Sequence, residues 1–213
     1  MRCDKKDLLL YGVTDRSWLG DRTLAQQVEA SLRGGATMIQ LREKHMDRGS
    51  ILAQALELRE LCGRYGVPLI LNDDAELAQA AGADGVHVGQ SDMEAGRVRA
   101  LLGEDKLIGV SARTVEQALA AQAAGADYLG VGAMFPTGTK QDTRPVSYDT
   151  LKAICAAVDI PVVAIGGIGA GNVAELAGSG IAGAAVVSAL YAQPDVEAAT
   201  RSLRAQVERV VGP

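Results

Sequence analysis

The feature that most constrains the fold of this 213-residue chain is the alternation of short apolar runs with helix-patterned segments along its whole length. Each run is continuously apolar, as is typical of parallel strands that are covered on both faces. The segments between the runs carry apolar residues at the i, i+3, i+4 spacing of amphipathic helices. The eight runs are Leu8–Thr14, Thr37–Leu41, Pro68–Asn72, Gly85–Gly89, Leu107–Ser111, Tyr128–Met134, Pro161–Ile165 and Ala184–Ser188.

Eight strands, each followed by a helix, predict a single (β/α)8 TIM barrel over residues 1–213. Segments 81–84 and 124–127 both read Ala-Gly-Ala-Asp, and glycine at such joints allows a tight turn from helix to strand. The T-x-x-Q patterns that begin at Thr23 and Thr114 predict capping boxes at two helix starts. A doubly wound sheet ranks second, because no glycine-rich turn follows the first run.

Composition excludes several classes of function. The net charge of −5 and an aromatic content of 3% argue against nucleic-acid binding, which favours a basic face with stacking platforms. No apolar run approaches the roughly 20 residues that span a bilayer, and Leu8-Leu9-Leu10 is too short for a signal sequence. Cys3, Cys62 and Cys155 lie far apart without metal-ligand spacing, as is typical of a reduced compartment. We therefore expect a cytoplasmic protein.

Polar residues gather at the predicted strand ends, where a barrel of this kind places its chemistry. Gln40, Arg42 and Lys44 alternate after the second run, so a continuing strand would put them on one face. Buried cations need a counter-charge, which indicates an anion site; the alternative is a strand end that runs into solvent. Asn72 and Ser111 close the third and fifth runs.

Asp73 and Asp92 follow the third and fourth runs, which are neighbours in the predicted barrel. Two carboxylates beside phosphate oxygens suit Mg²⁺, which completes its shell with water and substrate. The alternative is helix capping, by Asp73 or Asp74 for the third helix and by Asp92 for the fourth. The sequence leaves both possibilities open.

The last three strand ends suggest phosphate binding. Gly166-Gly167 and Val187-Ser188 fall where barrels often bind phosphate on backbone N–H groups, although a plain turn has the same residues. Segment 136–145 is the longest polar connection, and Thr137, Thr139 and Lys140 could form a flap over an anion or an ordinary surface loop. We expect His45 and His87 to be hydrogen-bonded structural groups.

With these motifs, the chain resembles the thiamine phosphate synthase family nearly end to end. The matching segments are Gln40-x-Arg42-x-Lys44, Asn72-Asp73, Gly85-Val86-His87-Val88-Gly89-Gln90-x-Asp92, Gly109-Val110-Ser111, Thr137-x-Thr139-Lys140, Gly166-Gly167-Ile168 and Val187-Ser188. The resemblance implies condensation of 4-amino-2-methyl-5-(diphosphooxymethyl)pyrimidine with 4-methyl-5-(2-phosphoethyl)thiazole, or its carboxylate form. The implied products are thiamine phosphate and pyrophosphate, formed through a pyrimidine methyl cation that the thiazole nitrogen captures.

The resemblance also implies roles for the strand-end residues. Those expected to hold the pyrimidine diphosphate are Gln40, Arg42, Lys44, Asn72, Ser111 and Lys140, with catalysis assigned to Ser111, Lys140, Arg42 and Lys44. Those expected to hold the thiazole phosphate are Thr137, Thr139, Gly167, Val187 and Ser188. Asp73 and Asp92 would hold Mg²⁺. The expected partners are these small phosphorylated substrates, and a homo-oligomer is possible; no nucleic acid and no membrane are expected.

The chain departs from the family pattern beside the site. Ala112-Arg113 stands where the family often has small polar residues and a histidine, and Gln141-Asp142-Thr143 stands where it often has a proline-rich run. Three rival interpretations are a thiazole tautomerase-like paralogue, a Schiff-base aldolase that uses Lys44 or Lys140, and a non-catalytic sensor of a thiamine precursor. The tautomerase would not need both aspartates together with the cationic residues.

Overall fold

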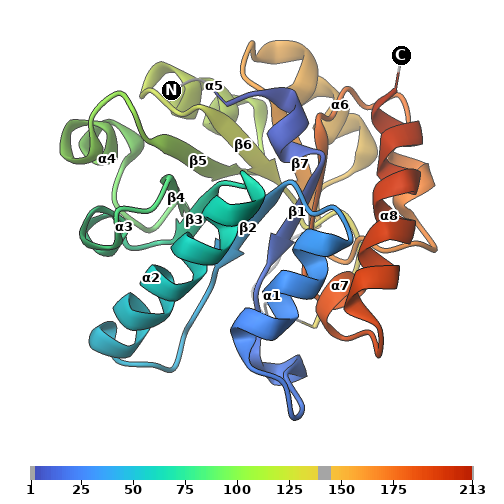
Figure 1. The fold of residues 1–213 in the computed structure, drawn as a ribbon. Coiled ribbons are helices and arrows are strands. Elements are labelled where there is room, and N and C mark those ends of the chain that lie inside the picture. The colour runs from blue at the N-terminus through green and yellow to red at the C-terminus, as the bar shows by residue number, and fades with distance from the viewer. Residues whose placement is uncertain (1–2, 139–144, 213) are drawn as a thin grey trace.

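The computed structural model describes residues 3–138 and 145–212, and within them eight parallel strands close into a barrel in chain order (Figure 1). The predicted (β/α)8 fold is therefore confirmed, and each strand overlaps one predicted run. The strands are β1 Leu10–Val13, β2 Met38–Leu41, β3 Leu69–Asn72, β4 Gly85–Val88, β5 Leu107–Ala112, β6 Tyr128–Val131, β7 Val162–Ile165 and β8 Gly183–Val186.

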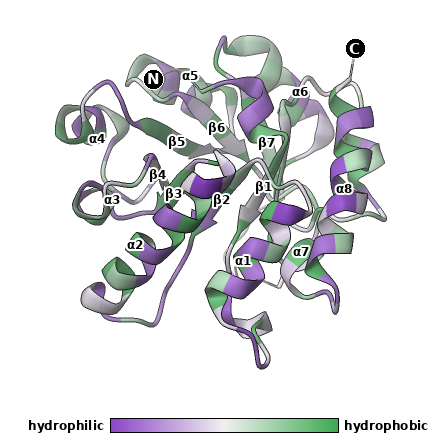
Figure 2. Ribbon diagram, in the orientation of Figure 1, coloured by the Kyte–Doolittle hydropathy of each residue, from purple (hydrophilic) through white to green (hydrophobic). Residues whose placement is uncertain are grey.

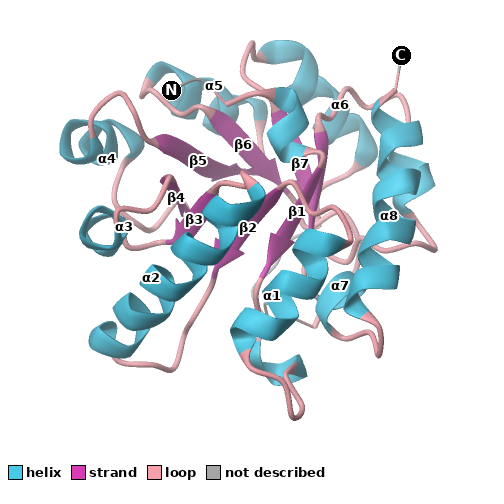
Figure 3. Cartoon of the chain, in the orientation of Figure 1, coloured by secondary structure: helices cyan, strands magenta, loops and turns pink. Residues whose placement is uncertain are grey.

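Helices surround the barrel, as Figure 3 shows. They are α1 Leu24–Arg33, α2 Arg48–Tyr65, α3 Ala75–Ala81, α4 Ala95–Leu102, α5 Val115–Ala123, α6 Tyr148–Ala157, α7 Ser188–Tyr191 and α8 Val196–Val211, with 3-10 helices η1 Lys5–Leu8, η2 Arg16–Trp18 and η3 Val173–Leu176. The expectation of a helix after every strand is wrong in one place, because only η3 follows β7. Glycines at 166, 167, 169, 171, 178 and 180 flank η3, and glycine disfavours helix.

Strand side chains alternate between two hydrophobic clusters. Tyr11, Met38, Ile70, Tyr128 and Val163 point into the barrel and form the inner cluster. The intervening strand residues point outward and pack against the helices. Figure 2 shows the result, with hydrophobic strands at the centre and helices that carry both hydrophobic and hydrophilic residues around them. The barrel interior is therefore a packed core.

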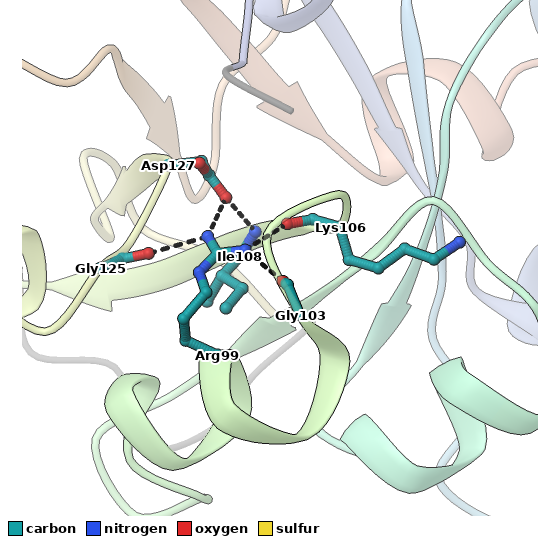
Figure 4. A network of polar contacts seen from close by, with 6 residues as sticks. All are labelled: Arg99, Gly103, Lys106, Ile108, Gly125 and Asp127. Atoms are coloured by element: carbon teal, nitrogen blue, oxygen red, sulfur yellow. Dashed lines mark hydrogen bonds and ion pairs between the residues drawn. The ribbon is translucent and has the colours of Figure 1, made fainter.

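The aspartates of the two Ala-Gly-Ala-Asp segments link neighbouring strands through hydrogen bonds. Asp84 accepts a hydrogen bond from the backbone N–H of Leu69 at 2.8 Å, and Asp127 accepts one from Ile108 at 2.8 Å. In both cases the aspartate just before one strand (β4 or β6) accepts a hydrogen bond from the start of the strand before it (β3 or β5). Arg99 completes the second joint through a 2.6 Å ion pair with Asp127 (Figure 4).

Helix starts follow the predicted caps in part. Thr23 forms the complete capping box with Gln26. At Thr114 the box is only half formed, because the hydroxyl accepts from the Gln117 N–H while the Gln117 side chain accepts from the Arg113 N–H. Among the residues that the structure describes, no helix is long and apolar enough to cross a membrane.

Candidate functional site

A deep cavity of about 160 Å³ lies inside the carboxyl end of the barrel, and every strand contributes to its lining. The strands β1 to β5 each contribute a polar side chain, and β7 and β8 form an apolar wall. The polar side chains from the strands are Tyr11, Gln40, Asn72, His87 and Ser111, and the apolar wall is formed by Val163, Ile165, Ala185 and Val186. The cavity can therefore hold a ring that is apolar on one side and hydrogen-bonded on the other.

A wider outer cavity of about 940 Å³ adjoins the deep one and is formed by loops together with residues of η2 and α7. Arg42, Thr137, Gly167 and Ser188 line both cavities, so the two are continuous. The outer cavity adds Lys44 and His45 from the loop after β2. Its basic side chains and loop backbone can bind the phosphate group of a molecule whose ring lies in the deep cavity.

The row Gln40, Arg42 and Lys44 divides between the two cavities. Gln40 and Arg42 line the deep cavity as the alternation predicts, and Gln40 is only 4% exposed. The strand ends at Leu41, so the alternation stops and Lys44 lies farther out, in the outer cavity. The alternative of a strand end in open solvent is wrong for Gln40, whose side-chain nitrogen donates to the Tyr11 hydroxyl at 2.7 Å.

Two ion pairs join the loop after β1 to the loop after β2. Asp15 lies 3.7 Å from Arg42, and Arg16 lies 2.7 Å from Glu43. Burial raises the pKa of the Glu43 carboxyl above its ordinary value, and the Arg16 guanidinium opposes this effect. The pairs fix the backbone that carries Arg42, so its guanidinium is held at the boundary of the two cavities.

The loop after β6 runs along the end of β7 and reaches the same mouth. Met134 and Phe135 donate backbone hydrogen bonds to Ile165 and Gly166 at 3.0 Å each. Gly167 has a φ of +68°, and a Cβ there would lie 2.5 Å from the Pro136 carbonyl oxygen. Glycine is thus required for contact between two loops, in addition to any closeness to a ligand that the sequence suggested.

The remaining residues expected to bind the thiazole phosphate divide by position. Thr137, Val187 and Ser188 line the deep cavity with Gly167. Ser188 begins α7, and Val187 stands at its N-cap position. Thr139 and Lys140 lie outside the described residues, so their predicted roles stay predictions.

Comparison with known proteins identifies the family. A sequence profile described as thiamine monophosphate synthase matches residues 10–190. A thiamine-phosphate synthase from Ruminiclostridium cellulolyticum is 48% identical over 93% of this chain and 95% of the relative. One from Chloroflexus aurantiacus is 50% identical over 94% of this chain and 93% of the relative.

The chain belongs to the thiamine monophosphate synthase family. A solved structure described as thiamine phosphate pyrophosphorylase from Pyrococcus furiosus superposes with a TM-score of 0.90 at 38% identity, covering 98% of this chain and 99% of that one. The resemblance inferred from the sequence is thereby confirmed, together with the enzyme class. The tautomerase-like and sensor interpretations are not favoured by these relatives.

The two aspartates expected to bind metal follow neighbouring strands, as predicted. Asp73 has a left-handed backbone with φ 65°, and its backbone N–H donates to the His87 carbonyl at 2.8 Å. Asp92 accepts from the Gly89 N–H at 2.7 Å, so the alternative that it caps α4 is wrong; Glu94 stands at that N-cap position. Asp74, not Asp73, caps α3.

Both candidate metal ligands are exposed carboxylates, and neither lines the described walls of the two cavities. No group of three or more His, Cys, Asp or Glu that could hold a metal occurs in residues 3–138 and 145–212. A hard cation such as Mg²⁺ needs only one or two protein carboxylates when substrate phosphates supply the other oxygens. Two carboxylates that follow neighbouring strands are thus a donor set of the size that Mg²⁺ accepts.

Sequence reasoning missed several lining residues. Tyr11 lies within an apolar run without a distinguishing pattern, yet it lines the deep cavity. Arg113, one of the two residues at which the chain departs from the family pattern after Ser111, lines the deep cavity. Trp18, which is 43% exposed, lines the outer cavity from η2. The signal in the sequence was a single tryptophan directly after the polar segment Asp15-Arg16-Ser17.

Proposed function

We propose that the deep cavity binds the pyrimidine ring and that the outer cavity binds the phosphates of the two substrates. As a thiamine phosphate synthase, the chain condenses 4-amino-2-methyl-5-(diphosphooxymethyl)pyrimidine with 4-methyl-5-(2-phosphoethyl)thiazole. The observation that carries the assignment is the size and lining of the deep cavity. Cavities of about 150 Å³ hold one benzene-sized ring, so a cavity of about 160 Å³ suits the pyrimidine alone.

The diphosphate of that substrate would extend toward the boundary between the cavities. Arg42 lines both, and Lys44 lines the outer one. Arginine offers several N–H donors in a fixed plane that matches phosphate oxygens, and lysine adds a point charge. These cations would stabilise the charge that grows on the diphosphate as it departs and leaves the pyrimidine methyl cation.

The thiazole phosphate would occupy the mouth where the two cavities meet, at Thr137, Gly167 and Ser188, which line both, and beside Val187. Its ring would then lie against the apolar wall of β7 and β8 and face the pyrimidine directly. This wall excludes water, which would otherwise compete with the thiazole nitrogen for the cation. The carboxylate form of the thiazole would bind in the same place.

Asp73 and Asp92 would hold Mg²⁺ against the diphosphate. When bound, the ion supplies neutralisation of leaving-group charge without a proton transfer. The hydrogen bond from Gly89 already orients one oxygen of Asp92, and the left-handed backbone of Asp73 turns that residue away from the strand direction.

The decisive experiment mixes the purified protein with both substrates, with and without Mg²⁺, and assays pyrophosphate. Release that needs both substrates supports the assignment. No release under any condition would overturn it in favour of the tautomerase-like or sensor interpretation. Omission of the thiazole phosphate is the matched control, because slow release without it would indicate hydrolysis by water.

A further inference from the structure

A chain of hydrogen bonds crosses the floor of the deep cavity and joins two of its walls. The Gln40 side-chain nitrogen donates to the Tyr11 hydroxyl at 2.7 Å, and the Tyr11 and Tyr128 hydroxyls are 3.0 Å apart. The Tyr128 hydroxyl lies 3.2 Å from His87 Nδ1, and His87 Nε2 lies 3.0 Å from Ser111 Oγ. We call these five residues the relay.

The middle of the relay is shut away from water. Tyr11 is 1% exposed and Tyr128 is fully buried. Burial raises the pKa of both phenols well above the ordinary value, so each keeps its one hydroxyl hydrogen. A buried O–H group without an acceptor destabilises the fold, so each of these hydrogens must be directed at a relay neighbour.

This requirement gives the relay a direction. An amide nitrogen only donates, so the Tyr11 oxygen accepts from Gln40 and the Tyr11 hydrogen goes to Tyr128. The Tyr128 hydrogen then goes to His87 Nδ1, the acceptor within reach. A neutral imidazole that accepts at Nδ1 carries its hydrogen on Nε2, which faces Ser111 Oγ.

Two glycines leave room for the relay. A Cβ on Gly109 would collide with both His87 Nδ1 and the Tyr128 hydroxyl. A Cβ on Gly130 would lie 2.9 Å from His87 Cε1. The contact between the imidazole and the phenol therefore exists only because two neighbouring strands have no side chain at these positions.

We propose that the relay is directional and that Tyr11, Tyr128 and His87 are positioning residues, which make Ser111 a hydrogen-bond donor into the deep cavity. Since Ser111 Oγ accepts from His87, its own hydrogen is directed at a bound molecule. The opposite direction would require Ser111 to donate to His87, and the serine could then only accept from a ligand. The relay thus selects which kind of atom Ser111 recognises.

The atom that Ser111 recognises is an acceptor, such as a ring nitrogen or the bridging oxygen of a diphosphate ester. This part of the inference rests on the proposed function, because it takes the pyrimidine diphosphate as the molecule in the cavity. Gln40 at the far end lines the same cavity. The relay therefore couples the hydrogen-bond direction at Gln40 to that at Ser111, and both side chains would lie against the pyrimidine ring.

The direction can be read from the histidine tautomer. The chain has two histidines, so the ligand-free protein labelled with ¹⁵N-histidine gives a simple spectrum, and His45→Gln assigns the signals. We expect His87 to show a protonated Nε2 and an unprotonated Nδ1. A hydrogen on Nδ1 would overturn the proposal. This readout needs no substrate, so it stands even if the assay for pyrophosphate fails.

The positioning role is tested by Tyr128→Phe, which removes the central hydroxyl without touching the described cavity wall. We expect kcat/KM for the pyrimidine diphosphate to fall about tenfold, the KM for the thiazole phosphate to stay unchanged, and the His87 tautomers to mix. Tyr191→Phe is the matched control, because Tyr191 is also fully buried but bonds Ser31 instead. Equal losses in both variants, or an unchanged tautomer in Tyr128→Phe, would overturn the proposal.

Discussion

Arg42 lies 3.7 Å from Asp15, with both side chains less than one-fifth exposed, at the boundary between the deep and outer cavities. The ion pair bridges the loops after β1 and β2. It orients the guanidinium before any substrate arrives, so the binding energy of a diphosphate need not be used to order a long side chain.

Arg42→Lys should raise the KM for the pyrimidine diphosphate about tenfold, because lysine keeps the charge but loses the planar donors that match phosphate. The KM for the thiazole phosphate should change little. Steady-state kinetics with each substrate varied in turn measures both values. Arg48→Lys is the control, since Arg48 pairs with Asp74 outside both cavities and should leave both constants unchanged. A larger effect on the thiazole phosphate would contradict the assignment of Arg42.

Asp73→Asn should raise the Mg²⁺ concentration for half-maximal activity at least about tenfold, because a ligand charge is lost. Asparagine tolerates the left-handed backbone at this position, so the fold should be unaffected. Asp74→Asn is the control, because it makes the same change at the adjacent residue, where asparagine can still cap α3. A titration that shifts equally in both variants would remove Asp73 as a ligand.

Gly109→Ala should destabilise the protein by about 1–3 kcal/mol, because the new methyl group collides with the buried Tyr128 and His87 side chains. Gly63→Ala is the opposite case, since a Cβ at Gly63 in α2 meets nothing within 4 Å. Alanine favours helix, so that variant should gain about 1 kcal/mol. Urea unfolding of both variants measures the difference, and a neutral Gly109→Ala would show that the barrel interior can relax.

Arg99→Met should cost about 3 kcal/mol, because it leaves the Asp127 carboxylate, which is only 12% exposed, without its cation. The same guanidinium also donates to the carbonyls of Gly103, Lys106 and Gly125 at 2.8–2.9 Å (Figure 4). Arg201→Met breaks an exposed pair within α8 and should cost under about 0.5 kcal/mol. Chemical denaturation compares the two, and similar losses would show that the buried joint adds no special stability.

Local sequence patterns predict the structure where neighbouring residues alone decide it. The complete capping box at Thr23 is an example, since all of its donors and acceptors lie within four residues. The same pattern at Thr114 was only half formed, because the Gln117 side chain bonds Arg113 instead. Asp92 looks like a helix cap in sequence, yet it closes a turn onto Gly89 and the helix starts later. In both cases nearby groups compete for the same hydrogen bonds. The loop geometry decides which pair forms, and residue spacing in the sequence does not specify that geometry.

By itself the sequence determined the eight strands, the parallel barrel and the set of polar residues at its carboxyl end, because apolar runs and helical periodicity are properties of adjacent residues. It also carried the family motifs that run through Gln40, Arg42 and Ser111. Only the tertiary structure decided that Tyr11 meets Tyr128, which lies 117 residues away along the chain. Contacts of this kind depend on strand register and on glycines that make space, so the cavity floor that links Gln40 to Ser111 exists only once the barrel closes.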